Sequence, residues 1–438
     1  MYLGNEVDNG STTTRIIGYP GDGHMLTIGP TRSGKSRRLL IPNLLYETGR
    51  SILVVDMKGE LAAITAPHRA AKGGAVVALD PFGVLPSRGV KIPSVGFNPM
   101  SGLDPASDEF VDDAMNLAEA LVQVKASDSD PHWAESAQDL VAGLIMLLRC
   151  VRGDKATLAM VRQEISRSPA EMELIAKQVL ESAPHEAVRN KLAKYADAPS
   201  DGKEIPSIMS NAQTQTRFLD SSGIARNLES DGIDFGALKT QNVTVYLVLP
   251  PERLLTHAKW LRLVISSAMM AMQRTLKTPG RPDVLFMLDE FPQLGHMEAI
   301  ETAVSLNAGY GVKVWAAVQH LGQLKEHYGE NWETFLSAGC VTTFAPRDVF
   351  TRDHLTKLIG TGTKTIPTTT YSPDGGVSVT NTIQKDDLVS AHDWRQMVMG
   401  EQWAFIPTDK GQMIKKIYSP DFSALPEVKA GHIKPGAV

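Results

Sequence analysis

Cysteine is nearly absent from the chain. The two that occur, Cys150 and Cys340, stand far apart in the sequence. Two distant cysteines cannot form the disulfide framework of a small secreted domain, so their scarcity indicates a reducing compartment.

Long hydrophobic runs are absent as well. No window approaches the roughly eighteen uncharged apolar residues that a membrane-spanning helix requires, so we expect that the chain does not span a membrane by itself. The N-terminal residues also lack the basic and apolar segments of a signal peptide. We therefore expect a cytoplasmic protein, with any membrane anchor preceding Met1 or belonging to a partner.

An excess of positive charge is missing too, because the formal net charge is −5 at pH 7. The surface as a whole is therefore not that of a polyanion-binding protein. Any contact with nucleic acid must come from a local basic patch or from an assembled pore. With 42% hydrophobic and 21% charged residues, the 438 residues can form two or three globular domains, or one large α/β domain with an insertion.

Short apolar runs bounded by turn residues are what the chain does contain. They are rich in Val, Ile and Leu and show little alternation, which predicts strands buried on both faces of a parallel sheet. These runs cover residues 24–30, 51–56, 75–80, 242–250, 284–290, 312–319, 341–346 and 401–407. Helical patterns separate several of them, for example at 258–276, and this order predicts a doubly wound α/β architecture.

The pattern changes in the middle of the chain, where strand-like runs disappear and helical ones dominate. We predict a first part of a nucleotide-binding domain at 1–98, an inserted all-α domain at 99–235 and the second part at 236–438. Residues 361–383 are rich in Thr, Gly and Pro and predict an exposed loop or loose hairpin. The Pro- and Gly-rich tail after Pro420 predicts a poorly packed end.

A phosphate-binding loop follows the first of these apolar runs. Gly29 to Ser36 match G-x-x-x-x-G-K-[ST] in full and precede a helical pattern, which favours a phosphate site over a chance glycine-rich turn. Gly29 and Gly34 permit the tight backbone path, Lys35 is expected to reach the β- and γ-phosphates, and the Ser36 hydroxyl to ligate Mg²⁺. The predicted nucleotide contacts are Gly29, Pro30, Thr31, Arg32, Ser33, Gly34, Lys35, Ser36 and Arg37.

Two later strand ends supply the other polar groups that nucleotide hydrolysis needs. Asp289 is expected to hold the Mg²⁺ shell and Glu290 to polarise the attacking water. Gln319 ends the next strand and is a candidate sensor of the γ-phosphate. The alternatives are an acidic pair that opens a helix, where carboxylates are favoured anyway, and an ordinary strand-end amide. The loop and these residues together predict an ATPase with Lys35, Glu290 and Gln319 as catalytic residues.

Several stretches together resemble one family, the TraG family of type IV secretion coupling proteins. They are "VVDMKGELAAIT", "VVALDPFG", "FNPM", "DPHWAESAQDLVAGLIMLL", "TQTRFLDSSGIARNL" and the long run from Leu288 to Gly329. The resemblance extends from about residue 20 to about 410, in the expected order. Three stretches are more specific to the family than the phosphate loop is. They are the D-x-K-G-E-L run, the helical pattern that begins with His132 and Trp133, and "AGYG".

The resemblance implies a hexameric ATPase related to the FtsK/HerA motors, with a RecA-like P-loop fold and a mostly parallel central sheet. Such a protein would use ATP and Mg²⁺ to recruit DNA–protein or effector substrates, a relaxase among them, to inner-membrane components of a conjugation or secretion machine. It would act at the cytoplasmic face of the bacterial inner membrane. Two alternatives remain: a substrate-receptor platform that binds ATP mainly for assembly, and a soluble DNA helicase or packaging ATPase of the same superfamily.

The chain also departs from the family pattern. It shows no pair of transmembrane helices, and "LNAGYG" contains no Arg to reach a neighbouring subunit's ATP. Arg347 and Arg352 are then the candidates for a trans-acting arginine, or they form surface ion pairs. Asp56 and Lys58 of "DMKGEL" are expected beside the nucleotide, or in a solvated turn.

Overall fold

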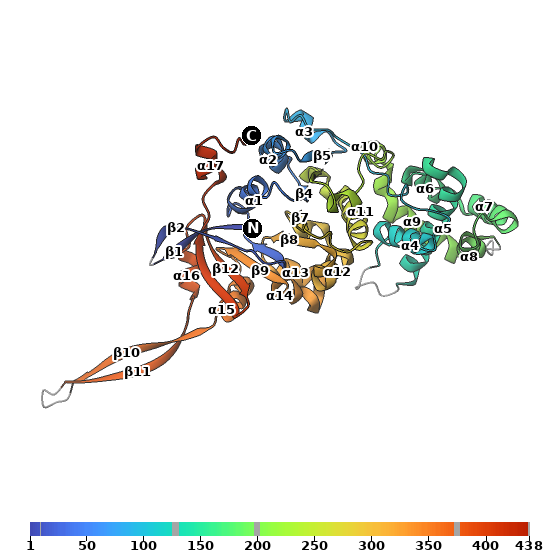
Figure 1. The fold of residues 1–438 in the computed structure, drawn as a ribbon. Helices are drawn as coiled ribbons and strands as arrows, with labels where there is room; N and C mark the ends of the chain where they lie inside the picture. Colours follow the sequence, from blue (N-terminus) through green and yellow to red (C-terminus); the bar gives the residue numbers. More distant parts are fainter. Residues whose placement is uncertain (9, 125–130, 197–201, 372–376, 437–438) are drawn as a thin grey trace. The chain divides into compact units, whose positions relative to one another are not determined.

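The computed structural model describes residues 1–8, 10–124, 131–196, 202–371 and 377–436 (Figure 1). The chain forms two compact units, each assembled from separate stretches of the sequence. The first unit contains Met1–Glu47, Leu288–Pro292 and Lys313–Pro435, and the second contains Thr48–Met287, Gln293–Val312 and Gly436–Val438.

The strands of the first unit lie in the spatial order β2-β1-β13-β12-β9-β3-β8. Their bounds are Tyr2–Asp8 (β1), Ser11–Gly18 (β2), His24–Ile28 (β3), Val312–Val318 (β8), Gly339–Phe344 (β9), Glu401–Thr408 (β12) and Gly411–Tyr418 (β13). Strand β3 lies between β8 and β9 and pairs with both in parallel, whereas β12, β13, β1 and β2 continue the sheet as antiparallel neighbours. All five residues of β3 are buried, as the continuous apolar run predicts.

Short helices complete the first unit. They are η1 (Ser36–Leu40), α1 (Ile41–Tyr46), α13 (Leu321–Tyr328), η9 (Gly329–Glu333), α14 (Thr334–Ser337), α15 (Val349–Ile359), α16 (Ala391–Gln396), η10 (Phe422–Ala424) and α17 (Pro426–Lys429). The prediction of a poorly packed tail after Pro420 is wrong, because the side chains of Phe422, Leu425 and Ile433 are buried. These three apolar residues anchor a segment whose Pro and Gly content suggested the opposite.

The second unit contains a smaller group of strands in the order β7-β4-β6-β5. They span Ile52–Asp56 (β4), Ala75–Leu79 (β5), Val243–Val248 (β6) and Val284–Leu288 (β7). Strand β6 pairs in parallel with β4 and β5. The helices nearest to these strands in the sequence are α2 (Glu60–Ala71), α3 (Val84–Ser87), α11 (Leu254–Gln273) and α12 (Glu298–Leu306), with the short turns η5 (Gly236–Lys239), η6 (Pro251–Arg253), η7 (Phe291–Leu294) and η8 (Asn307–Tyr310). The predicted α/β class, with parallel strands around the phosphate loop, is confirmed.

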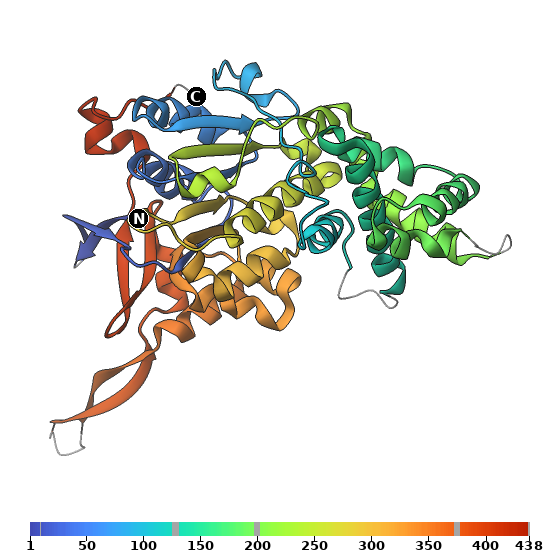
Figure 2. The ribbon, with the colours of Figure 1, turned by 45° about the vertical axis from the view of Figure 1, so that its right-hand side comes forward.

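The described part of residues 99–235 contains helices and turns and no strand. The helices are α4 (Phe110–Leu121), α5 (His132–Arg152), α6 (Leu158–Ile165), α7 (Pro169–Ser182), α8 (Glu186–Leu192), α9 (Glu204–Thr216) and α10 (Ser222–Asn227), with η2 (Gly153–Lys155), η3 (Ala193–Tyr195) and η4 (Arg217–Asp220). Helix α5 contacts α4, α6, α8 and α9, so it is the centre of this helical group (Figure 2). The helical character of this stretch agrees with the sequence pattern, and the domain boundaries at 99 and 235 stay a prediction.

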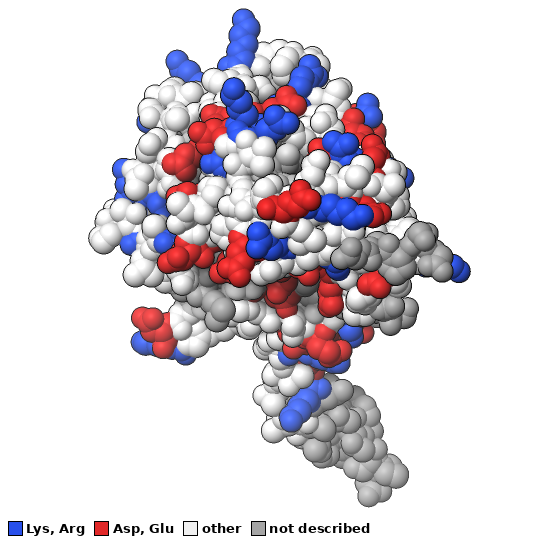
Figure 3. All heavy atoms as spheres, turned by 90° about the vertical axis from the view of Figure 1, so that its right-hand side faces the viewer, with Lys and Arg blue, Asp and Glu red and all other residues white. Residues whose placement is uncertain are grey.

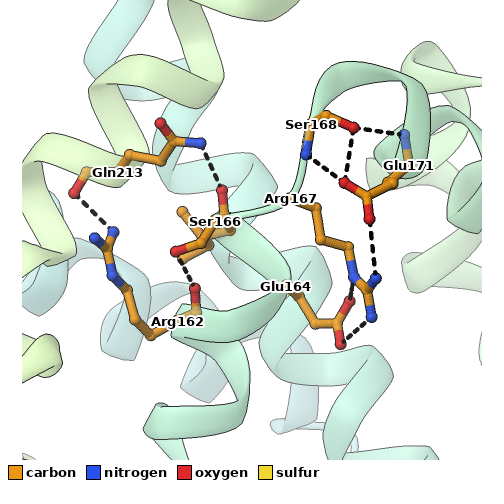
Figure 4. A network of polar contacts seen from close by, with 8 residues as sticks. Arg162, Glu164, Ser166, Arg167, Ser168, Glu171 and Gln213 are labelled. Carbon is orange, nitrogen blue, oxygen red and sulfur yellow. Dashed lines mark hydrogen bonds and ion pairs between the residues drawn. The ribbon is translucent and has the colours of Figure 1, made fainter.

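The turn between α6 and α7 shows how polar contacts fix the helical group (Figure 4). Ser168 and Glu171 form a capping box at the start of α7, in which each side chain accepts a hydrogen bond from the other residue's backbone N–H. Arg167 forms an ion pair with Glu164 at 2.5 Å. Gln213 of α9 donates to the carbonyl oxygen of Ile165 at 2.9 Å. These contacts satisfy helix ends that the chain would otherwise leave unpaired.

Strands β10 (Thr361–Tyr371) and β11 (Val377–Asp387) form a separate two-stranded ribbon, which extends outward in Figure 1. They pair antiparallel in continuous register from Thr361 opposite Asp387 to Tyr371 opposite Val377. The prediction of an exposed loop or loose hairpin at 361–383 is therefore confirmed as a hairpin. Its central residues 372–376 lie outside the described part of the chain.

Because this ribbon pairs with no other described strand, we expect that its removal leaves the remaining fold intact. Replacing residues 363–385 by a short Gly-Ser linker should shift the thermal unfolding midpoint by no more than about 2 °C, since a loss of 1 kcal/mol shifts it by about 2–4 °C in larger domains. Differential scanning calorimetry gives the measurement. Leu355→Ala, which empties a fully buried position in α15, is the matched control and should cost about 2–5 kcal/mol. A hairpin deletion as damaging as Leu355→Ala contradicts the expectation.

Candidate nucleotide-binding site

The phosphate loop connects β3 to η1 in the first unit. The N–H of Gly29 donates to the carbonyl oxygen of Val318 in β8 at 2.9 Å, which fixes the start of the loop at the carboxyl edge of these parallel strands. The N–H of Ser33 donates to Pro30 O and the N–H of Arg38 to Gly34 O, so the loop turns directly into the helix. The backbone N–H groups of this strand–loop–helix arrangement are suited to an anion.

The loop residues fit a phosphate group by their conformation and by an unused polar atom. Gly34 has φ +92°, and a Cβ at Gly29 would come within 2.6 Å of Ser33 Oγ, so both positions require glycine or displacement of a neighbour. Arg32 also has a positive φ of 64°. The buried Ser33 Oγ has no hydrogen-bond partner among the described residues. A loop with this strained path and an unsatisfied hydroxyl is typical of a ligand site.

Lys35 is the buried cation of the site, with 5% of its surface exposed. Its Nζ lies 2.7 Å from Glu290 Oε1. A buried ammonium group requires an anionic partner, because its desolvation costs several kcal/mol. Glu290 supplies that charge from the end of β7, where it adopts φ 52°. Arg32 and Glu290 are the two non-glycine residues of the described chain with positive φ, and both lie in this site.

Ser36 and Asp289 form the second contact between the loop and the end of β7. The Ser36 hydroxyl donates to Asp289 Oδ2 at 3.3 Å, and the Glu290 N–H donates to Asp289 Oδ1 at 3.1 Å. Desolvation by the surrounding protein raises the pKa of Asp289 to about 6, while the Lys35 ammonium group favours its charged form. A hydroxyl and a carboxylate side by side are the oxygen ligands that Mg²⁺ prefers.

Gln319 joins the loop to Glu290. Its Nε2 donates to Glu290 Oε2 at 2.9 Å, and its Oε1 accepts from Thr31 Oγ1 at 3.2 Å. The Gln319 N–H donates to Gln323 Oε1 at 2.9 Å, which fixes the backbone at the end of β8. The five side chains predicted to carry the chemistry, Lys35, Ser36, Asp289, Glu290 and Gln319, therefore meet in one connected network.

Two arginines of the helix after the loop contact the C-terminal segment. Arg37 Nε and Nη2 donate to the Asp421 carboxylate at 2.8 and 3.1 Å, and the guanidinium carbon lies 4.6 Å from the centre of the Phe422 ring. Arg38 Nη1 donates to Ser419 O at 2.8 Å. The side chain of Arg37 is therefore paired with a carboxylate, whereas the sequence assigned Arg37 to the nucleotide. Sequence reasoning missed Asp421 because nothing in the sequence marks it as a neighbour of the loop.

Asp56 has a local structural task in the second unit. Its carboxylate accepts hydrogen bonds from the N–H groups of Lys58, Glu60 and Ala62, at 3.3, 3.1 and 2.8 Å. These bonds close the turn after β4 and satisfy the first donors of α2, with Gly59 at φ +67° between them. The exposed side chain of Lys58 matches the alternative of a solvated turn.

Replacing Asp56 by Ala should lower the free energy of unfolding by about 1–3 kcal/mol, because a buried acceptor of three N–H groups is lost. Urea denaturation followed by circular dichroism measures this change. The matched control is Lys58→Ala two residues away, for which we expect a change within about 0.5 kcal/mol because the side chain is exposed. Equal effects of the two substitutions contradict the capping role.

Arg347 lies two residues before α15, and Arg352 lies in its first turn. Arg347 is exposed and Arg352 half-buried, and neither forms an ion pair with another described residue. The alternative in which both make surface ion pairs within the chain is therefore wrong for the described residues. A trans-acting role stays a prediction.

Comparison with known proteins identifies the family. The family profile described as Type IV secretory system Conjugative DNA transfer matches residues 3–425. The chain belongs to this family.

Two curated relatives show how far the family resemblance extends. Over 366 residues, 79% of this chain, it is 29% identical to the conjugal transfer protein TraG of Escherichia coli, of which the match covers 56%. It is 31% identical to protein VirD4 of Agrobacterium fabrum (strain C58 / ATCC 33970) over 80% of this chain and 51% of that protein. The chain thus spans about half the length of the curated relatives that it matches.

Solved coupling-protein structures share the fold. The unbound conjugative coupling protein TrwBdeltaN70 superimposes with a TM-score of 0.68 at 14% identity, covering 92% of this chain and 86% of that one. A TrwB structure in complex with ADP and Mg²⁺ gives a TM-score of 0.65 at 14% identity, over 91% and 85% of the two chains. This TraG/VirD4-family chain therefore has a TrwB-like P-loop fold with a helical region. Among the described residues, no helix combines the length and apolar character needed to cross a bilayer.

Proposed function

We propose that this chain hydrolyses ATP to drive conjugative DNA transfer through a type IV secretion machine. The observation that carries the proposal is the network of Lys35, Ser36, Asp289, Glu290 and Gln319 at the phosphate loop of a chain matched to the conjugative DNA transfer family. The TraG relative is a conjugal transfer protein, and TrwB has been solved in complex with ADP and Mg²⁺. These likenesses support the proposed nucleotide and function of this chain.

Each residue of the network has a proposed task. The loop from Gly29 to Ser36 binds phosphates through its backbone N–H groups, and Lys35 transfers its ion pair from Glu290 to the β- and γ-phosphates. Glu290, released from Lys35, accepts a proton from the attacking water, and Gln319 orients that water through its hydrogen bond to Glu290. Bound Mg²⁺ would neutralise charge on the phosphates, and Ser36 and Asp289 are the residues that would hold it.

Lys35→Ala should lower steady-state ATP turnover by about 100-fold or more, because it removes the cation that stabilises phosphate charge.

Glu290→Gln should keep ATP binding, since the amide preserves the shape of the side chain, and should lower turnover by about 100- to 10,000-fold through loss of the base. Released phosphate and binding of a fluorescent ATP analogue give the two measurements. Lys325→Ala, an exposed lysine of the same unit, is the control and should leave both unchanged. Normal turnover in Lys35→Ala contradicts the site assignment.

The proposed partners follow from the family. We propose a homohexamer at the cytoplasmic face of the bacterial inner membrane, which recruits DNA, a relaxase or effector proteins to inner-membrane components of the machine. A receptor platform that binds ATP mainly for assembly is the second candidate. It predicts ATP hydrolysis that is indifferent to DNA, whereas a motor predicts stimulation. A soluble helicase or packaging ATPase predicts stimulation by DNA without a secretion partner.

In such an oligomer we propose Arg347 as the arginine that reaches the neighbouring subunit's ATP, because its exposed guanidinium has no partner among the described residues. Arg347→Ala should lower turnover by about 1,000-fold or more, the effect of an arginine finger in other P-loop enzymes. Mixing Arg347→Ala subunits with Lys35→Ala subunits should restore part of the activity. An Arg347→Ala subunit keeps an intact phosphate loop, and a neighbouring Lys35→Ala subunit supplies the arginine. Phosphate release measures both outcomes. Lys325→Ala, which removes an exposed charge of the same unit, is the control. Full activity of Arg347→Ala contradicts the proposal, and loss of activity in Arg352→Ala instead would assign the role to Arg352.

A further inference from the structure

Residues near the end of the chain contact the helix that follows the phosphate loop. This helix begins as η1 and continues as α1, and it belongs to the first unit. The same unit contains residues 419–433, here called the C-terminal segment. The proposed ATP chemistry uses Lys35 and Ser36 at the start of the helix and gives the C-terminal segment no task.

Arg37 makes the first contact, directly after Ser36. Its Nε and Nη2 donate to the two carboxylate oxygens of Asp421 at 2.8 and 3.1 Å, so the pair is bidentate. The same carboxylate accepts hydrogen bonds from the N–H and the hydroxyl of Ser423, at 3.1 and 2.8 Å. Burial favours the neutral form of Asp421, but the hydrogen bonds from Arg37 and Ser423 outweigh it and lower the pKa of this carboxyl. Asp421 is therefore a charged partner of fixed orientation.

Arg38 connects the phosphate loop itself to the C-terminal segment. Its Nη1 donates to Ser419 O at 2.8 Å. A Cβ added to Gly34 would lie 2.8 Å from Arg38 Cδ, so the stem of Arg38 packs directly against the backbone of the loop. Ser419 is fully buried, and its hydroxyl donates to Leu3 O at 2.5 Å. The guanidinium group of Arg38 is thus attached to a fixed point in the sheet.

A third contact lies at the far end of the helix. Tyr46, the last residue of α1, donates its hydroxyl to Glu427 Oε2 at 2.7 Å. The C-terminal segment buries its own apolar side chains, those of Phe422, Leu425 and Ile433. It is therefore a packed segment that contacts both the first and the last turn of the helix.

The first turn of this helix is irregular. The N–H of Ile41 donates to Ser36 O, five residues earlier, which is the hydrogen bond of a π-type turn. Such turns are rare and frequently occur at functional sites. Because the turn departs from the regular helix that follows it, contacts outside the helix are needed to fix its position. Arg37 and Arg38 supply these contacts.

The pair of Arg37 and Asp421 differs from ordinary surface ion pairs. Figure 3 shows Lys, Arg, Asp and Glu interspersed over the face that it draws, and exposed pairs between such residues typically contribute little to stability. Arg37 and Asp421 are 384 residues apart, their contact is bidentate, and only 25% of the Asp421 side chain is exposed. A pair with these properties can fix one segment of the chain against another.

We propose that the C-terminal segment positions the phosphate loop, with Asp421 as a positioning residue that acts through Arg37. The segment holds the first turn of the helix and, with it, the backbone N–H groups and the Ser36 hydroxyl that face the nucleotide. Nucleotide binding and attachment of the segment are then coupled, and each strengthens the other by the same factor. The inference rests on the proposed function of this site.

Nucleotide binding and ATP turnover by the full chain test the proposal. Asp421→Asn keeps an oxygen that accepts from Ser423 but removes the charge that holds Arg37. It should raise both the KM for ATP and the Kd of a fluorescent ATP analogue by about three- to tenfold, as expected for a bidentate but partly exposed pair. The kcat should stay within about twofold, because Glu290 and Gln319 do not contact the segment. Partial loss of folded protein would instead lower kcat and leave KM unchanged.

A double substitution shows whether Asp421 acts through Arg37. Arg37→Met removes the guanidinium group, keeps an apolar stem beside Phe422 and should weaken nucleotide binding as much as Asp421→Asn does. The double variant should bind no more weakly than the weaker single variant, because both substitutions remove the same contact. If Arg37 contacts the nucleotide itself, Asp421→Asn should free it and tighten binding. Tighter binding in Asp421→Asn therefore overturns the proposal.

Amide hydrogen exchange gives a measurement that does not depend on turnover. Adding Mg²⁺ and ADP to the unaltered chain should slow exchange in residues 419–433 by about three- to tenfold, because the coupling is reciprocal. The slowing should be smaller in Asp421→Asn. Residues 408–411, in the turn between β12 and β13 of the same unit, should exchange at the same rate with and without nucleotide.

Asp409→Asn is the matched control. It makes the same substitution at an exposed aspartate of the β12–β13 turn, which forms no ion pair with another described residue, and it should change neither KM nor Kd. Thermal unfolding of each variant verifies the fold. If Asp421→Asn fails to fold, Tyr46→Phe still tests the segment, because it removes only the hydroxyl that donates to Glu427. It should weaken nucleotide binding by about two- to fivefold.

The possible results are distinct. Weaker nucleotide binding in Asp421→Asn, with kcat preserved and Asp409→Asn unchanged, supports the proposal. Normal binding in both Asp421→Asn and Tyr46→Phe overturns the positioning role and leaves the proposed function intact. A fall in kcat at unchanged KM also overturns the positioning role. Failure of the unaltered chain to bind the ATP analogue or ADP overturns both the positioning role and the proposed function.

Discussion

The ion pair between Lys35 Nζ and Glu290 Oε1, at 2.7 Å, is the contact on which the candidate site depends. Burying a lysine with only 5% of its surface exposed carries a desolvation cost, which a nearby anion offsets. The sequence supplies that anion from a segment 255 residues later, and the same glutamate is bonded to Gln319. Phosphate and Glu290 would therefore compete for one ammonium group, which connects nucleotide binding to the position of the proposed base. Glu290 also has a positive φ of 52°, so backbone strain is located at the same residue.

The sequence predicted the parts of the fold that obey strong local rules. A complete phosphate-loop motif between a buried strand and a helix locates Lys35 and Ser36, and continuous apolar runs locate β3 to β9 and β12. Asp289, Glu290 and Gln319 were predicted because they are polar residues at the ends of apolar runs. The carboxyl ends of parallel strands lie at the same edge of a sheet, so such residues come close together. The connections among these side chains follow from that geometry.

Other features could not be read from the sequence because their causes are not local. Strands β1, β2 and β13 alternate or contain charge, and only pairing with the rest of the sheet decides their conformation. Asp421 contacts Arg37 across 384 residues, and no pattern announces such a pair. The sequence placed Asp56 either beside the nucleotide or in a solvated turn. The hydrogen bonds that its carboxylate accepts show that it caps a helix.

The parallel pairing of β3 with β8 and β9 also sets an order for synthesis. Strand β3 leaves the ribosome early, but the N–H of Val314 that bonds to His24 belongs to a residue 290 positions later. At about 5–20 residues per second, that interval is roughly fifteen seconds to a minute. During that time, the five buried residues of β3 have neither β8 nor β9 to pair with, and the phosphate loop lacks Asp289, Glu290 and Gln319 as neighbours. The candidate nucleotide site of this chain is thus completed late in translation, after most of the chain has been made.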